Sequence, residues 1–257
     1  MPFKHIRSKL LLLALAALAT VGAQARSFDE VKKGGKLVFA TEGQFAPFNY
    51  FVGAKLSGFE IDVAEAVAAK MGLKIEWKAL GFDALLAGLR QDRWDVVIAS
   101  HGITEERAKA VTFTEPHYCS GGVIVAKDAA VKSAKDLAGK VVSVQTGTTY
   151  LENVKKVAGV KEVKNFPGDN DARAALATGR VDAWVTDRFV AKGALEANPG
   201  LGLKMGDFLF VERIAAAVAK GNQSLAGEYN KALAAVMADG TYARLTKQWF
   251  NEDIRCK

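Results

Sequence analysis

The sequence predicts an α/β fold of two lobes that share a pair of extended hinge strands and have a cleft between them. Short runs of β-forming residues alternate with helical segments along almost the whole chain, which is typical of βαβ units in a parallel sheet. Two longer extended runs, residues 122–127 and 208–219, are expected to cross between the lobes. The crossings make one lobe discontinuous, residues 26–120 with 213–257, and leave residues 121–212 as a continuous second lobe. Two bodies joined in this way can close around a ligand.

The expected first lobe consists of alternating strands and helices. In chain order these are a strand at 36–40, a helix at 61–71 that Gly72 ends, a strand at 74–80, a helix at 83–90 and a strand at 95–99. The polar run Ser100-His101-Gly102 follows the last of these strands. Ligands of open α/β sheets lie beyond the carboxyl ends of the strands, so this run is a candidate binding segment.

The expected second lobe has its own units of the same kind. Ser133 and Asp136 stand at capping-box spacing, and a strand at 140–145 leads into Gly147 and a helix that we expect Thr149 to cap, with Glu152 three residues on. A helix at 171–178 and a strand at 183–186 follow, and that strand delivers Asp187 at its carboxyl end.

The chain is expected to return to the first lobe in two helices. Ser224 is the expected cap of a helix that runs to Asp239, and the last helix covers residues 241–250.

The N-terminus has the pattern of a secretory leader. Three basic residues precede an apolar run at 10–21, and the small-residue site Ala23-Gln24-Ala25 predicts cleavage after Ala25. The apolar run is shorter than the roughly 20 residues of a membrane span, although an uncleaved N-terminal anchor is the alternative. The sequence therefore predicts an exported protein.

Composition excludes several classes of protein. Without the leader the net charge falls from +7 to +4, and the basic residues are interspersed with acidic ones, so nucleic-acid binding is not expected. Neither cysteine lies in a spacing that suits zinc or a redox centre, and we expect no metal and no cofactor. An even pair of cysteines in an oxidising compartment favours one disulfide, Cys119 with Cys256, over two free thiols.

Charged and polar groups at the strand ends suit a zwitterionic ligand. Arg107 can bind a carboxylate through two parallel N–H bonds, and the helix start at Thr148 and Thr149 adds backbone donors. Asp187 can accept an ammonium group, although an acid in this place often only caps the following helix. The three segments together predict a binding site for an amino-acid-like molecule.

The chain resembles the bacterial polar-amino-acid-binding proteins that serve ABC transporters, family 3 of the extracellular solute-binding proteins. The matching segments cover nearly the whole mature length: Gly35-Lys36-Leu37-Val38, Phe45-Ala46-Pro47-Phe48, Gly58-Phe59-Glu60-Ile61-Asp62, Ile103-Thr104-Glu105-Glu106-Arg107, Gly147-Thr148-Thr149, Gly179-Arg180-Val181-Asp182-Ala183 and Trp249-Phe250. The resemblance implies the two-lobed periplasmic binding protein fold of type II. It also implies a monomer that captures an amino acid or a derivative in the periplasm and delivers it to the permease subunits of an ABC transporter.

Site residues follow from the resemblance motif by motif. In the family, the arginine of the Ile-Thr-x-Glu-Arg motif clamps the ligand carboxylate, which falls on Arg107, and the threonine after Gly-Thr does likewise, which falls on Thr149. The aspartate that binds the α-amino group falls on Asp187. The aromatic residues that enclose the ligand side chain fall on Phe45 and Phe82.

The chain departs from the family at the start of the arginine motif. The position two before Thr104 usually holds Ser or Thr, whose hydroxyl helps to bind the α-amino group, but here it is Gly102. His101 replaces a residue that is commonly apolar, and it can reach the ligand or form a wall of the site. Glu42 stands where relatives often have an acid near the ligand side chain, which indicates a basic or polar ligand. The alternative is that Glu42 is a surface carboxylate without a part in binding.

Two functions remain open at this stage. The expected one is ligand capture without catalysis. The alternative is a periplasmic dehydratase of the cyclohexadienyl or arogenate type on the same fold, in which Glu42 or His101 would transfer protons.

Overall fold

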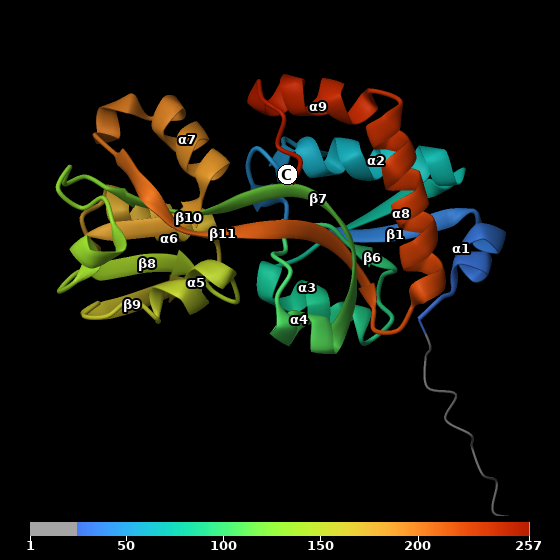
Figure 1. The fold of residues 1–257 in the computed structure, drawn as a ribbon, viewed down its shortest axis with the longest axis horizontal. Helices are drawn as coiled ribbons and strands as arrows, with labels where there is room; N and C mark the ends of the chain where they lie inside the picture. Colours follow the sequence, from blue (N-terminus) through green and yellow to red (C-terminus); the bar gives the residue numbers. More distant parts are fainter. Residues whose placement is uncertain (1–24, 257) are drawn as a thin grey trace, which may run out of the picture.

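Two groups of elements are joined by two long strands in the computed structural model, which describes residues 25–256 (Figure 1). One eight-stranded sheet runs through both groups in the order β5-β1-β6-β11-β7-β10-β8-β9. The two hinge strands β7 and β11 lie in the middle of this order, so each half of the sheet belongs to one lobe. The expected α/β fold with two lobes is confirmed.

The first lobe is built on three parallel strands. β1 (Lys36–Thr41) lies between β5 (Lys74–Ala79) and β6 (Val96–Val97). Figure 1 shows α2 (Phe59–Met71), α8 (Gln223–Ala238) and α9 (Thr241–Phe250) on one face of this sheet, and α3 (Phe82–Leu89) and α4 (Glu105–Ala110) on the other. The short α1 (Phe28–Gly34) precedes β1.

Alternation along β1 explains why both faces are covered. Leu37 and Phe39 belong to the larger apolar core under α2 and α8, whereas Ala40 belongs to a second core with Phe82 and Leu85 of α3. Successive side chains of a strand point to opposite faces, so one strand supplies both cores.

The second lobe repeats the scheme around β8 (Val141–Gln145), which is parallel to β9 (Glu162–Phe166) and β10 (Ala183–Asp187). Its helices are α5 (Thr149–Val154), α6 (Asp169–Ala177) and α7 (Arg188–Ala197), with single 3₁₀ turns at Ala134–Leu137 and Pro199–Leu201.

The hinge strands are longer than the sequence indicates. β7 (Val111–Ala126) and β11 (Lys204–Ala219) have 16 residues each and pair antiparallel along most of their length. Ser120 lies opposite Glu212 and Cys119 opposite Arg213, so the expected chain crossings at 120 and 213 are side by side. Cys119 and Cys256 are disulfide-bonded with 4.8 Å between their Cα atoms, and Cys119 also donates its N–H to Ile254. The C-terminal tail is therefore fastened to the hinge.

A separate three-stranded antiparallel sheet was not expected. It consists of β2 (Gln44–Phe45), β3 (Asn49–Val52) and β4 (Lys55–Ser57). Its first strand contains Phe45, for which no strand was predicted.

Two of the three expected helix caps are wrong by one or two residues. The capping box of Ser133 with Asp136 is confirmed. α5 is capped by Thr148, whose hydroxyl accepts from Leu151 N, and Thr149 is the first residue of the helix and donates its hydroxyl to Glu212. α8 is capped by Asn222 instead of Ser224, since the amide oxygen of Asn222 accepts from Leu225 N.

The predicted leader, residues 1–25, lies outside the described residues except for Ala25. Within residues 25–256, each helix is too short or too polar to cross a membrane.

Candidate ligand-binding site

A small cavity lies where segments that follow β1 and β6 face the end of β8 and the start of α5. It is lined by Glu42, Phe45, Phe82, Ala99, Ser100, Arg107, Gln145, Thr148, Thr149 and Tyr150. Its free volume is about 10 Å³, roughly the room of one water molecule, so a larger ligand requires the lining side chains to move apart. Seven of the ten residues are sequence-predicted candidates, and they come from both lobes.

Arg107 lies between the two lobes. It is on α4, which begins after its cap Thr104, and it is half-buried. Its Nη1 donates to the carbonyl oxygen of Gly102 in the first lobe and its Nη2 to that of Gly147 in the second, each at 2.9 Å. Burial lowers the pKa of the guanidinium, which nevertheless stays charged. A cation hydrogen-bonded to neutral carbonyls is a natural partner for an anion.

The start of α5 provides donors on the opposite wall. Gly147 has φ of 75°, a left-handed conformation that lets the chain turn directly from β8 into the helix. The first N–H groups of a helix lack intrahelical partners, and the positive end of the helix dipole lies there. Thr148 and Thr149 therefore face the cavity from a point that favours a bound carboxylate.

Aromatic rings form two sides of the cavity. Phe82 stacks on His101 with ring centroids 4.2 Å apart, and the Arg107 guanidinium lies 5.7 Å from the Phe82 ring. His101 is buried behind Phe82 and does not line the cavity, and burial holds its pKa well below the usual value, so the ring is neutral. Phe45 stacks on Phe48, which is fully buried in the core.

Glu42 is a buried carboxyl group at the end of the cavity. Its side chain accepts a hydrogen bond from Gln145 Nε2 at 2.5 Å, which joins the two lobes directly. Burial raises the pKa of Glu42 to about 8, because no cation within residues 25–256 lies near enough to offset the lost hydration. Gln145 was not predicted, although it is the last residue of an expected strand, which is where ligand-binding residues of such sheets lie.

Ser100 is held in place from below. It is a non-glycine residue with φ of 55°, and its N–H and hydroxyl both donate to the Glu60 carboxylate. Glu60 is fully buried and also contacts Asn49 Nδ2 and His117 Nε2. The buried network of Glu60 thus fixes a strained turn at the cavity wall.

Asp187 lies outside the cavity lining. It is buried, and it caps α7 by accepting from the N–H groups of Phe189 and Val190 at Oδ1, while Oδ2 accepts from the Ser120 hydroxyl. Burial raises its pKa to about 6 against these hydrogen bonds. Gly102 also lies beside the cavity and reaches it only through its carbonyl contact with Arg107.

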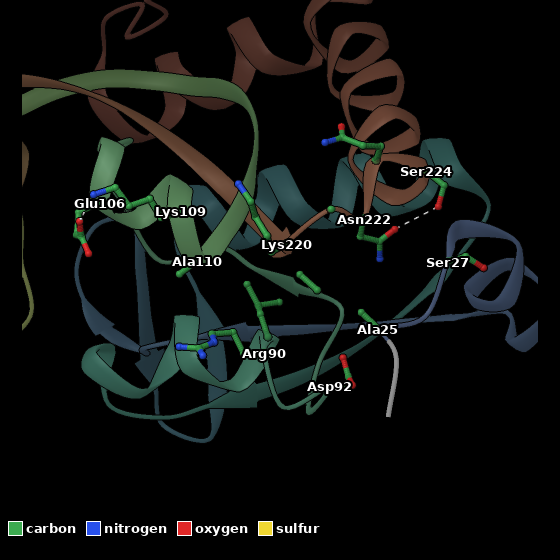
Figure 2. A pocket seen from close by; sticks show the side chains of 14 residues that line it. Ala25, Ser27, Arg90, Asp92, Glu106, Lys109, Ala110, Lys220, Asn222 and Ser224 are labelled. Carbon is green, nitrogen blue, oxygen red and sulfur yellow. Dashed lines mark hydrogen bonds and ion pairs between the residues drawn. The ribbon is translucent and has the colours of Figure 1, made fainter. Parts of the chain in front are cut away.

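A wider hollow lies elsewhere, at the far end of the first lobe, between α3, α4 and the start of α8 (Figure 2). Lys109 pairs with Glu106 at its rim, and Ser224 donates to Asn222. These four side chains form an ion pair and a hydrogen bond with one another, whereas the polar side chains of the interlobe cavity line a common space.

Residues 37–252 match the profile of the bacterial extracellular solute-binding proteins, family 3. The chain belongs to this family. Among its relatives, the family 3 protein is 34% identical over 248 residues to a probable amino-acid ABC transporter-binding protein of Haemophilus influenzae, covering 95% of this chain and 96% of the other. It is equally similar, at 34% over 248 residues, to ABC transporter arginine-binding protein 1 of Escherichia coli, with 94% and 98% covered.

Solved structures agree with the family. An ancestral arginine-binding protein bound to arginine superposes with a TM-score of 0.81 at 43% identity and covers 84% of this chain and 98% of its own. The ancestral amino acid-binding protein AncCDT-1, a precursor of cyclohexadienyl dehydratase, has a TM-score of 0.80 at 31% identity, with 87% and 99% covered. The two-lobed fold of this family 3 protein is therefore that of amino-acid-binding proteins.

Proposed function

We propose that this family 3 protein binds one amino acid in the interlobe cavity and releases it unchanged to a transporter. The observation that carries the proposal is the position of Arg107, whose two terminal nitrogens bond backbone carbonyls from opposite lobes. A ligand carboxylate makes stronger, charge-assisted bonds than these carbonyls, so it can replace them and still hold both lobes together. The helix start at Thr148 and Thr149 supplies further donors for the same group.

The chemistry of the cavity favours a polar or cationic side chain on the ligand. Glu42 is the carboxyl group at the end of the cavity. Its pKa is raised because it is buried and no cation among the described residues offsets the lost hydration of its ionised form. A guanidinium or imidazolium placed there would favour the ionised form of Glu42, and the rings of Phe45 and Phe82 would pack on its faces. Relatives named for arginine or cystine, and a neighbour with bound arginine, support an amino acid of this kind as the ligand.

We further propose that the protein acts in the periplasm as a monomer. Export through the predicted leader with cleavage after Ala25 would release it there. The loaded form would then dock on the permease subunits of an ABC transporter, as the names of its relatives imply.

Dehydratase activity on a prephenate-like acid is the second candidate, because AncCDT-1 is described as a precursor of such an enzyme. Glu42 would be its proton donor, since a carboxyl with a pKa of about 8 holds its proton at neutral pH. The relatives at 34% identity are named for amino-acid transport and arginine binding, which favours capture over this reaction.

Isothermal titration calorimetry with arginine, histidine, glutamine and cystine tests both candidates. A micromolar Kd corresponds to about 8 kcal/mol, which two or three charge-assisted bonds and ring contacts can supply. We expect at least one amino acid to bind at this level, and Glu42→Gln to weaken arginine more than glutamine. Conversion of prephenate by the wild-type protein but not by Glu42→Gln, without heat from any amino acid, would replace capture by catalysis.

A further inference from the structure

Gly102 is the place where this chain departs from the binding motif, and its surroundings explain the departure. A Cβ atom built on Gly102 would lie 1.9 Å from Oε2 of Glu212 and 2.9 Å from its Cδ. The backbone of Gly102 is not among the left-handed glycines, so its conformation does not require glycine. The missing side chain therefore makes room for the carboxylate of Glu212.

Glu212 lies on the hinge side of Thr149 and, like Asp187, is outside the cavity lining. It is on β11 opposite Ser120 of β7, and its Oε2 accepts a hydrogen bond of 2.8 Å from the hydroxyl of Thr149, a residue of the cavity lining. Its other oxygen, Oε1, is buried and makes no hydrogen bond within the described chain. A buried carboxylate oxygen without a donor is costly and uncommon, so a ligand donor is the natural complement.

The neighbouring charges identify the kind of donor. Burial raises the pKa of Glu212 to about 7. The hydroxyls of Thr149 and Tyr150 and the cation of Arg107 oppose this shift, and the charge of Asp187 adds to it. Both oxygens of Asp187 already accept hydrogen bonds from Ser120 and the start of α7. Two neighbouring carboxylates favour the binding of a cation between them. Glu212 is the better acceptor for that cation, because its Oε1 has no hydrogen-bond partner among the described residues, whereas both oxygens of Asp187 already accept hydrogen bonds.

We propose that Glu212 is a specificity-determining residue that accepts the α-ammonium group of the ligand in place of the hydroxyl that Gly102 lacks. The inference rests on the proposed function, since it assigns one more contact to the same bound amino acid. Asp187 then contributes mainly its negative charge near the ammonium group, while its oxygens cap α7. Glu212 accepts a hydrogen bond from Thr149 of the second lobe and lies next to Gly102 of the first lobe. It therefore binds the ammonium group only when the two lobes are together.

Calorimetry with matched ligands tests this role. Three amino acids of the panel are each paired with the counterpart that lacks the α-amino group: arginine with 5-guanidinopentanoate, histidine with imidazolepropionate and glutamine with glutaramate. A hydrogen bond to a charged group predicts that Glu212→Gln weakens the amino acid by about 10- to 100-fold. The desamino ligand should change by less than about threefold.

Control variants separate this contact from a general effect. Glu152→Gln removes a carboxylate from α5 that influences Arg107 but is exposed to solvent, and it should leave both ligands unchanged. Gly102→Ser should weaken the amino acid because the added hydroxymethyl group and the carboxylate of Glu212 compete for one space. The double variant Gly102→Ser with Glu212→Ala restores a hydroxyl with room for it, and should bind the amino acid better than Glu212→Ala alone.

Two outcomes would overturn the inference in distinguishable ways. If the wild-type protein binds no amino acid, the proposed function fails, and the role of Glu212 fails with it. If the wild-type protein binds an amino acid but Glu212→Gln weakens it and the desamino ligand equally, or the double variant shows no recovery, the function stands and the ammonium contact does not. Thermal melting of each variant verifies that it is folded.

Discussion

Replacement of Arg107 by alanine is the most direct test of the site. Its guanidinium uses two nitrogens to bond carbonyls from opposite lobes, and a bound carboxylate would take both bonds. Two charge-assisted hydrogen bonds contribute about 1.5–3 kcal/mol each, so their loss predicts about 3–6 kcal/mol, or roughly 10²- to 10⁴-fold in Kd. Arg107→Lys keeps the charge without the fork and should lose about 10- to 100-fold.

The fold should tolerate both changes. α4 has no buried residue, so its contribution to the core is small. We expect the melting temperature to fall by only a few degrees. Arg90→Ala is the matched control, because this exposed arginine lines the remote hollow of Figure 2 and should leave the calorimetric Kd unchanged. A Kd for Arg107→Ala within threefold of the wild type would refute the assignment of the carboxylate clamp.

Two further predictions concern stability. The disulfide between Cys119 and Cys256 joins residues 137 apart in sequence, for which chain entropy predicts a loss of up to about 5 kcal/mol on removal. Urea unfolding of the variant with serine at both positions measures this, and a loss below about 1 kcal/mol would contradict it. The Glu42 pKa is about 8 in the folded state against 4.5 unfolded, so its protonated form favours folding below pH 4.5, and that stability is lost as pH rises through about 8. Between pH 5 and 9 the ligand-free wild type should therefore lose more melting temperature than Glu42→Gln, whereas parallel curves would show that Glu42 ionises normally.

The spacing of apolar residues along the chain predicted most of the strands and helices. The predicted strands and helices agree with the structure to within a few residues except for the start of β7, because burial on both faces of a sheet imposes a strict local pattern. α1, α4, β9 and α7 were not predicted. Caps were less accurate. Thr148 and Thr149 have the same side chain, and the sequence does not distinguish the hydroxyl that caps α5 from the one that donates to Glu212, 63 residues after Thr149.

The expected binding residues differ in how well the structure brings them together. Arg107, Thr149, Phe45 and Phe82 meet around one cavity, because each follows a strand or begins a helix at the same edge of the sheet. Asp187 obeys the same rule, yet its carboxylate is used by α7 and Ser120. Its part in ligand binding stays a prediction.

The amino-acid sequence by itself determined the class of this protein: an α/β chain whose strand-end motifs identify a binding protein for a small zwitterion. The tertiary structure alone decided which groups share a space. Glu212 is on a hinge strand without a motif, and only the pairing of β7 with β11 brings its carboxylate to Gly102 and Thr149. The physical reason is that local patterns record which face of an element is buried, whereas contacts between distant segments depend on register and packing that no short stretch encodes.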